Sequence, residues 1–291
     1  WLTRDRVTQS EISKWLANCR ENHGFDVLSV AEASVALGCN IFTEQLIEFL
    51  SPTQDALLDF FSAKVDGDLE DMKTKLIVAT ELSRAINTRD LELEGRARME
   101  LGLIEFQEGD LERARDSFTW AETRLKSVSR YSLQHDISLL NKAAFHYAVG
   151  EDLMALNFYG EISLEKSHAD EAKAISRVGA GNILKNRGHT SSAARHYWNA
   201  HTIFSNTPLV EMMFESGILF LELATKNRDE KAEDMQIQVK SAKPMASGDT
   251  IPHAKINDAD IDFIIKSCTA LIIEYNDVFN QSDIMDFIEL C

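Results

Sequence analysis

The chain has 291 residues, of which 44% are hydrophobic, so it can bury a sizeable core and global disorder is excluded. Its net charge of −17 repels phosphate backbones, which argues against nucleic acid as a partner. No apolar run reaches the roughly 18 residues of a membrane-spanning helix, so we expect no membrane insertion.

Helix-favouring residues dominate the composition, and no long stretch alternates β-branched with polar residues. The sequence therefore predicts an all-α protein. The four cysteines, Cys19, Cys39, Cys268 and Cys291, show no metal-type spacing. Free thiols in a reducing compartment explain them most simply, so we expect a cytoplasmic protein without a cofactor.

Residues 1–52 are predicted to form an N-terminal helical cap. Part of this segment has the pattern of a helix-turn-helix, but Ile41–Leu50, which would read the bases, contains Glu44 and Glu48 and no Arg or Lys. DNA recognition requires basic and amide side chains at those positions. The cap is therefore the better interpretation.

A repeated unit begins with the next segment and is clearest around Gly102. A small residue at Gly102 is followed by a turn at Gly109, a second small residue at Ala114 and an aromatic residue at Phe118. Small residues at two points allow paired helices to approach closely, and the aromatic ring fills the space beside the contact. The unit therefore predicts an antiparallel helix pair.

The same spacing recurs elsewhere in the chain. The turn glycine falls seven residues after the first small position, and the second small position falls twelve residues after it. Two copies keep this pattern in full: Ala143, Gly150, Ala155 and Tyr159, then Gly181, Gly188, Ala193 and Tyr197. A degenerate copy precedes them, at Phe60, Gly67, Met72 and Leu76. A fifth first helix follows them, around Gly217 within Leu209–Leu223.

This pattern resembles the tetratricopeptide repeat family over residues 53–226. The resemblance implies a right-handed superhelical solenoid of antiparallel helix pairs. We call the first contact positions of the five pairs the reference positions: Phe60, Gly102, Ala143, Gly181 and Gly217. They are 42, 41, 38 and 36 residues apart, against about 34 in the standard repeat. Longer helices are therefore expected, such as one over Leu111–Val128.

The sequence after the repeats divides into two parts. Residues 227–258 are polar and lack apolar periodicity, which predicts a long flexible loop. Residues 259–291 are predicted to contain helices that close the solenoid. Ala259–Tyr275 is apolar on most sides, so we interpret it as the second helix of the fifth pair.

No recognisable catalytic or metal-binding motif is present. His189, His196 and His201 are seven and five residues apart, which does not suit zinc on one helix face. Asp258 and its acidic neighbours lack the glycine and the final glutamate of a calcium loop. We therefore expect a protein that is not an enzyme.

In the tetratricopeptide family the first helices of successive pairs line a concave groove. The family pattern places these residues on that face: Arg96, Met99, Glu100, Leu103, Gln107, Leu140, Asn141, Tyr147, Val178, Asn182, Lys185 and Asn186. Members that bind a C-terminal carboxylate carry Lys and Asn where this chain has Met99 and Leu103, so that ligand is not expected. The amides suit the backbone of a peptide, or they are simply solvated.

The resemblance therefore implies a scaffold or adaptor that binds a peptide or partner segment in this groove. The alternative is a peptide-sensing regulatory domain of a larger signalling protein, because repeats of this length resemble those of kinesin light chains and of peptide-sensing regulators of Gram-positive bacteria. Arg98 and Arg177 stand where the family has a large apolar residue, and the sequence alone does not explain them.

Overall fold

The computed structural model describes residues 50–162, 164, 167–227, 256–275 and 278–291. Within these ranges all regular structure is helical, which confirms the predicted all-α class for this part of the chain. The chain divides into two compact units, unit 1 over residues 1–130 and unit 2 over residues 131–291. The predicted cap over 1–52 and the predicted loop over 227–258 lie almost entirely outside the described residues.

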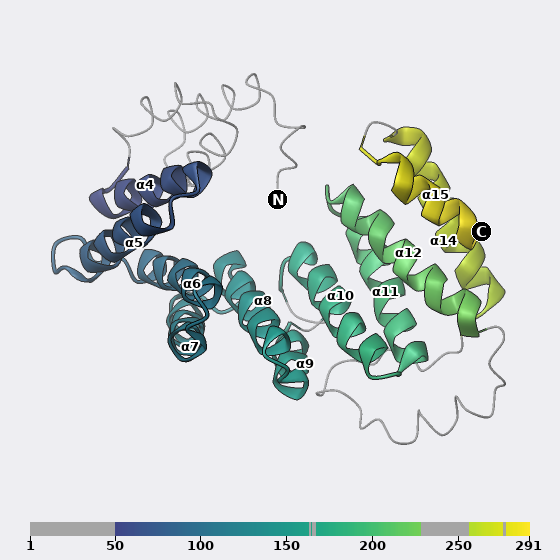
Figure 1. Cartoon of the computed structure of the whole chain (residues 1–291), viewed down its shortest axis with the longest axis horizontal. Coiled ribbons are helices and arrows are strands. Elements are labelled where there is room, and N and C mark those ends of the chain that lie inside the picture. Colours follow the sequence, from purple (N-terminus) through teal and green to yellow (C-terminus); the bar gives the residue numbers. More distant parts are fainter. Residues whose placement is uncertain (1–49, 163, 165–166, 228–255, 276–277) are drawn as a thin grey trace. The chain divides into compact units, whose positions relative to one another are not determined.

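Unit 1 contains four described helices, each packed against the next (Figure 1). They are α4 (Pro52–Asp66), α5 (Leu69–Arg84), α6 (Leu91–Gln107) and α7 (Leu111–Val128). The core of α4, α5 and α6 includes the fully buried side chains of Leu57, Phe60 and Leu76. Phe60 thus fills its reference position as a core residue.

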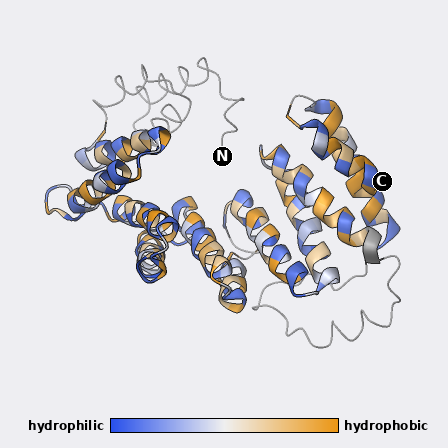
Figure 2. Ribbon diagram, in the orientation of Figure 1, coloured by the Kyte–Doolittle hydropathy of each residue, from blue (hydrophilic) through white to orange (hydrophobic). Residues whose placement is uncertain are grey.

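Unit 2 contains seven described helices, and here too most neighbours in sequence pack together. They are α8 (Leu133–Ala148), α9 (Asp152–Glu161), α10 (Asp170–Asn186), α11 (Thr190–Phe204), α12 (Val210–Asn227), α14 (Asp258–Glu274) and α15 (Gln281–Leu290). Hydrophobic and hydrophilic residues alternate around the helices of both units (Figure 2). Each helix therefore offers apolar residues to its neighbours and polar ones to water.

Local sequence sets the ends of these helices. Ser51 and Asn257 form capping boxes at the starts of α4 and α14, and aspartates cap α5, α6 and α7. The predicted turn glycines Gly67, Gly109, Gly150 and Gly188 all have φ between 77° and 83°. Side chains rarely adopt this left-handed conformation, so glycine is required where the first helix of each pair stops and the second begins.

The glycines at the reference positions allow close approach between paired helices. A Cβ added at Gly102 would lie 3.1 Å from Cε1 of Phe118, and one at Gly181 would lie 2.6 Å from Cε1 of Tyr197. The aromatic residue of the second helix therefore lies directly over the glycine, as the repeat pattern predicts. Any larger residue at Gly181 would displace the ring.

The fifth reference position follows the same rule with different residues. A Cβ at Gly217 would lie 2.5 Å from Sγ of Cys268 and 3.3 Å from Cγ2 of Ile264, both on α14. Ile264 and Cys268 are four residues apart, like Ala114 and Phe118 in the pair formed by α6 and α7. Helix α14 thus packs on α12 as the second helix of a pair, although residues 228–257 separate the two in sequence. Within the described residues, no helix combines the length and apolar character needed to cross a membrane.

The close approach of α10 and α11 predicts the effect of overpacking. Ala193 is fully buried on α11. Ala193→Leu adds volume at this contact and should lower the free energy of unfolding by ~1–3 kcal/mol, measured by urea denaturation. Ala270→Leu makes the same change at an exposed position of α14 and should leave stability nearly unchanged. Equal stability of the two variants would contradict the assignment of Ala193 to a tight helix contact.

Acid should destabilise unit 2 through His196. Burial, aided by the nearby Arg177 charge, lowers the pKa of His196 from 6.5 to about 3. Below pH 6.5 His196 is protonated in the unfolded chain but stays neutral in the folded chain. The free energy of unfolding therefore falls by about 1.4 kcal/mol for each pH unit. His196→Gln should lose less stability than the wild type between about pH 7 and about pH 5. Identical losses in urea denaturation at the two pH values would contradict this assignment.

Candidate functional site

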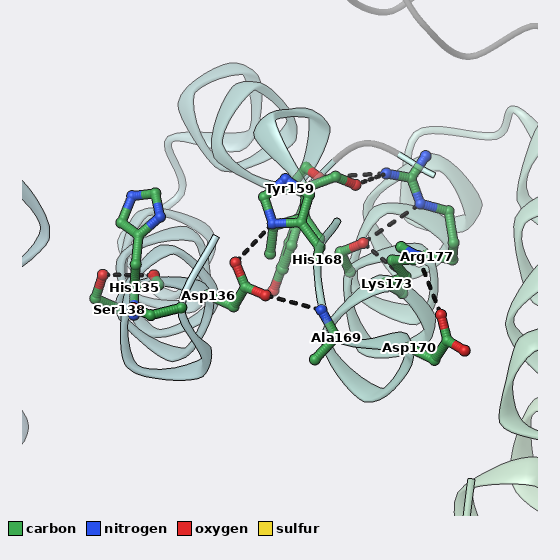
Figure 3. A network of polar contacts seen from close by, with 12 residues as sticks. His135, Asp136, Ser138, Tyr159, His168, Ala169, Asp170, Lys173 and Arg177 are labelled. Atoms are coloured by element: carbon green, nitrogen blue, oxygen red, sulfur yellow. Dashed lines mark hydrogen bonds and ion pairs between the residues drawn. The ribbon is translucent and has the colours of Figure 1, made fainter. Parts of the chain in front are cut away.

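A buried polar network holds the segment that leads into α10 (Figure 3). The carboxylate of Asp136 on α8 lies 2.6 Å from Nδ1 of His168 and accepts a hydrogen bond from the backbone N–H of Ala169 at 3.1 Å. Asp136 is fully buried, and the ring of Tyr131 packs edge-on against His168. Asp136 binds His168 and Ala169, the two residues immediately before α10, and therefore fixes where this helix begins.

Arg177 completes this framework on the other side of α10. Its side chain is fully buried, and Nη2 donates to the backbone carbonyls of Tyr159 and Ile162 at 3.3 and 3.0 Å (Figure 3). Carbonyls at a helix end lack partners within the helix. Arg177 therefore satisfies the end of α9, at a position where the resemblance to tetratricopeptide repeats implied an apolar residue.

The face of unit 2 made by α8, α10 and α12 carries a cluster of hydroxyl and amide groups. The ring of Tyr197 passes beside Gly181, and its hydroxyl donates to Oδ1 of Asn182 at 2.7 Å. The Tyr159 ring, on α9 of the preceding helix pair, lies against Gly179, where any side chain would overlap it. The missing side chains at the two glycines thus let tyrosines of the second helices reach α10.

A second set of polar groups bridges consecutive first helices. Nδ2 of Asn186 on α10 donates to the Tyr147 hydroxyl on α8. Nζ of Lys185 on α10 lies 2.7 Å from Glu222 on α12. In both bridges, the residue four positions after one reference position meets the residue five positions after the next. We call these residues, together with Asn141 on α8, the polar face of unit 2: Asn141, Tyr147, Tyr159, Asn182, Lys185, Asn186, Tyr197 and Glu222.

Burial and neighbouring groups keep the tyrosines of this face protonated. Burial raises the pKa of Tyr159 to about 12, with a further contribution from Tyr147. Burial also raises the pKa of Tyr197, with smaller contributions from Glu222, Tyr147 and Glu215. Both hydroxyls are therefore neutral hydrogen-bonding groups at physiological pH.

Several amide groups on this face have unused hydrogen-bonding capacity. Among the described residues, Asn141 makes no side-chain hydrogen bond, and Asn182 uses only its oxygen. Asn186 uses only its nitrogen, and its side chain is exposed. Donors and acceptors thus remain available along three positions of α8 and α10. Such groups match those of a peptide backbone.

The groove residues predicted from the sequence fall into two groups. In unit 2, Leu140, Asn141, Tyr147, Val178, Asn182, Lys185 and Asn186 are all half-buried or exposed, and five of them carry polar side chains. Leu140 and Val178 pack at the edges of the unit 2 cores, where part of each side chain remains accessible.

The predicted residues of unit 1 are less suited to a ligand. Arg96 and Met99 are only 7% and 4% exposed, because α6 packs against both α5 and α7 and little of its surface is left. Glu100 is bound by Lys64 at 2.8 Å, whereas Leu103 is half-buried and Gln107 exposed. Arg96 and Met99 are therefore too buried to contact a ligand. The candidate site consists of the predicted groove residues of unit 2.

Two residues of the candidate metal motifs, Asp260 and His201, have structural partners. Asp260 belongs to the capping box of α14 and lies 3.4 Å from Arg195. His201 is buried, with Nδ1 at 2.8 Å from the Met213 carbonyl and Nε2 at 2.8 Å from the Ser267 hydroxyl. In the described part of the chain, no three His, Cys, Asp or Glu side chains are grouped to hold a metal ion.

Comparison with known proteins adds no relative. No protein-family model matches the chain, and no curated protein is significantly similar to it. The resemblance to tetratricopeptide repeats therefore rests on the repeated positions themselves and stays a prediction.

The pairing of Tyr197 with Asn182 predicts that opposite substitutions at two equivalent positions both destabilise the protein. In the pair of α6 and α7, Phe118 and Leu103 stand where α10 and α11 have Tyr197 and Asn182. Tyr197→Phe should cost about 1 kcal/mol in urea denaturation, because a hydrogen bond is lost. Phe118→Tyr should also destabilise, because the new hydroxyl meets Leu103 instead of an amide. A neutral Tyr197→Phe combined with a stabilising Phe118→Tyr would contradict this reading.

Proposed function

We propose that the chain is a tetratricopeptide-type repeat protein, stacked in the right-handed sense of that family, that binds a peptide or partner segment on the polar face of unit 2. The observation that carries this proposal concerns three amides on consecutive first helices, Asn141, Asn182 and Asn186. Each has a hydrogen-bonding group that no described residue of the chain satisfies. The two polar bridges keep the helices that carry them in register.

The ligand that fits this face best is an extended segment of polypeptide. Its backbone offers N–H and C=O groups at regular spacing, and the amides of Asn141 and Asn182 can meet either. Leu140 and Val178, half-buried on the same two helices as the amides, supply apolar contacts for its side chains. Lys185 is already paired with Glu222, so an acidic ligand group would have to compete with that carboxylate.

The test removes the amides and the lysine together. The full chain is first used to select binders from a displayed random-peptide library, and an enriched peptide is then measured by fluorescence anisotropy. Asn141→Ala/Asn182→Ala/Lys185→Ala should weaken its binding by roughly a hundredfold, because a neutral hydrogen bond contributes about 1 kcal/mol and a charged one about 1.5–3 kcal/mol.

The matched control removes the same residue types elsewhere in unit 2. Asn157, Asn206 and Lys266 are exposed and lie on α9, after α11 and on α14. Their triple change to Ala alters the charge equally and should leave the affinity near that of the wild type. Circular dichroism of both variants checks that the helices persist. Enriched peptides that bind the first triple variant as tightly as the wild type would contradict the proposal, as would a library that yields no binder.

A further inference from the structure

Unit 1 contains a cluster of positive charge that the proposed function does not use. Trp120 on α7 has three guanidinium groups over its ring, from three different helices. The Cζ atoms of Arg84, Arg98 and Arg124 lie 5.4, 6.0 and 4.8 Å from the ring centroid. Because a ring has two faces, at least two of the three guanidinium groups share one face. We call Arg84, Arg98, Trp120 and Arg124 the Trp120–arginine cluster.

One carboxylate accompanies these three cations. Glu94 on α6 is 3% exposed, and its two oxygens lie 2.5 Å from Nε of Arg84 and 3.3 Å from Nε of Arg124. Arg84 Nε donates a hydrogen bond to Glu94, whereas Arg124 Nε meets the carboxylate as an ion pair without a hydrogen bond. Within the described residues, neither side chain makes any other hydrogen bond. Their terminal Nη groups, four N–H bonds on each side chain, are left for another acceptor. Arg84 and Arg124 remain 50% and 31% exposed, so solvent reaches them.

Arg98 has no carboxylate partner among the described residues. Its Nε atom is buried without a hydrogen bond, and its guanidinium lies over the Trp120 ring. Three guanidinium groups and one carboxylate leave a local charge of about +2. The chain as a whole has a net charge of −17, so this local excess of positive charge is opposite in sign to the overall charge of the protein.

We propose that the Trp120–arginine cluster binds a phosphate monoester group. At neutral pH a phosphate monoester has a charge of about −1.5 to −2 and three strong acceptor oxygens, which match the local charge and the free Nη donors. Guanidinium groups bind such oxygens in a bidentate manner, and stacking on an aromatic ring fixes their planes in advance. The two oxygens of Glu94 lie against the Nε atoms of Arg84 and Arg124, and among the described residues no hydrogen bond uses the Nη donors of these arginines.

A phosphorylated peptide or free phosphate fits this cluster better than nucleic acid does. A phosphodiester has one charge per phosphate, and the acidic chain repels a long polyanion. The proposal is independent of peptide binding by unit 2, because none of its residues belongs to the polar face of that unit.

The experiment measures binding of a fluorescein-labelled peptide that contains a single phosphoserine, by anisotropy with the full chain. The phosphorylated peptide should bind at least about tenfold more tightly than its unphosphorylated twin. Competition with inorganic phosphate identifies the source of the affinity. Displacement by phosphate alone shows that the phosphate group suffices, and resistance to it shows that the peptide also contributes.

The decisive variant is Arg84→Gln/Arg98→Gln, which should weaken phosphopeptide binding by at least about tenfold, because hydrogen bonds to a charged group are lost. Arg84→Gln alone, at a half-exposed position, gives the same direction should the double variant fail to fold. The control Arg89→Gln/Arg113→Gln removes two exposed arginines of unit 1 outside the cluster and should leave binding unchanged.

Three results would overturn the proposal. The first is equal binding of the phosphorylated and unphosphorylated peptides, and the second is equal weakening by the control variant. The third is binding of a single-stranded oligonucleotide through the same arginines without any binding of the phosphopeptide.

Discussion

Paired helices approach each other closely at reference positions that carry a very small residue. The rest of the structure depends on this constraint. At Gly181 the absent side chain leaves space that the Tyr197 ring fills, and at Gly217 it leaves space for Cys268 and Ile264. The left-handed glycine seven residues after each of the first four reference positions then reverses the chain, so each of these pairs closes on its own contact. The Tyr159 and Tyr197 rings of the polar face are positioned by such approaches, because they reach α10 where Gly179 and Gly181 leave room.

Two buried charged groups of unit 2, Asp136 and Arg177, are satisfied by long-range partners. Asp136 binds the backbone at Ala169, which is 33 residues further along the chain, and Arg177 binds the carbonyls of Tyr159 and Ile162. Removing one partner from such a buried set leaves the other unsatisfied, which costs more than the bond contributes. The same interactions therefore fix α9 and α10 relative to each other and keep the half-used amides of α10 in place.

The sequence predicted the features that repeat and missed those that occur once. The helix over Leu111–Val128 and the turn at Gly188 follow from spacing and turn chemistry, which are local. The partners of Arg177 and Asp136 could not be predicted, because they join positions whose proximity exists only after folding. One contact could have been predicted from the sequence. Tyr197 and Asn182 stand at the positions that Phe118 and Leu103 occupy in the pair of α6 and α7, so a hydroxyl and an amide appear together. The burial of Arg96 depends on how neighbours cover α6, which no single helix pattern shows.

The central claim, that the polar face of unit 2 is a peptide-binding surface, is tested most directly by locating a bound peptide. Side-chain amide resonances of the ¹⁵N-labelled chain can be recorded as a library-selected peptide is added. The NH₂ signals of Asn141, Asn182 and Asn186 should shift together and saturate at one peptide concentration, while those of Asn157 and Asn206 stay in place. Saturable shifts confined to Asn157 and Asn206, with the three amides of α8 and α10 unmoved, would contradict the claim.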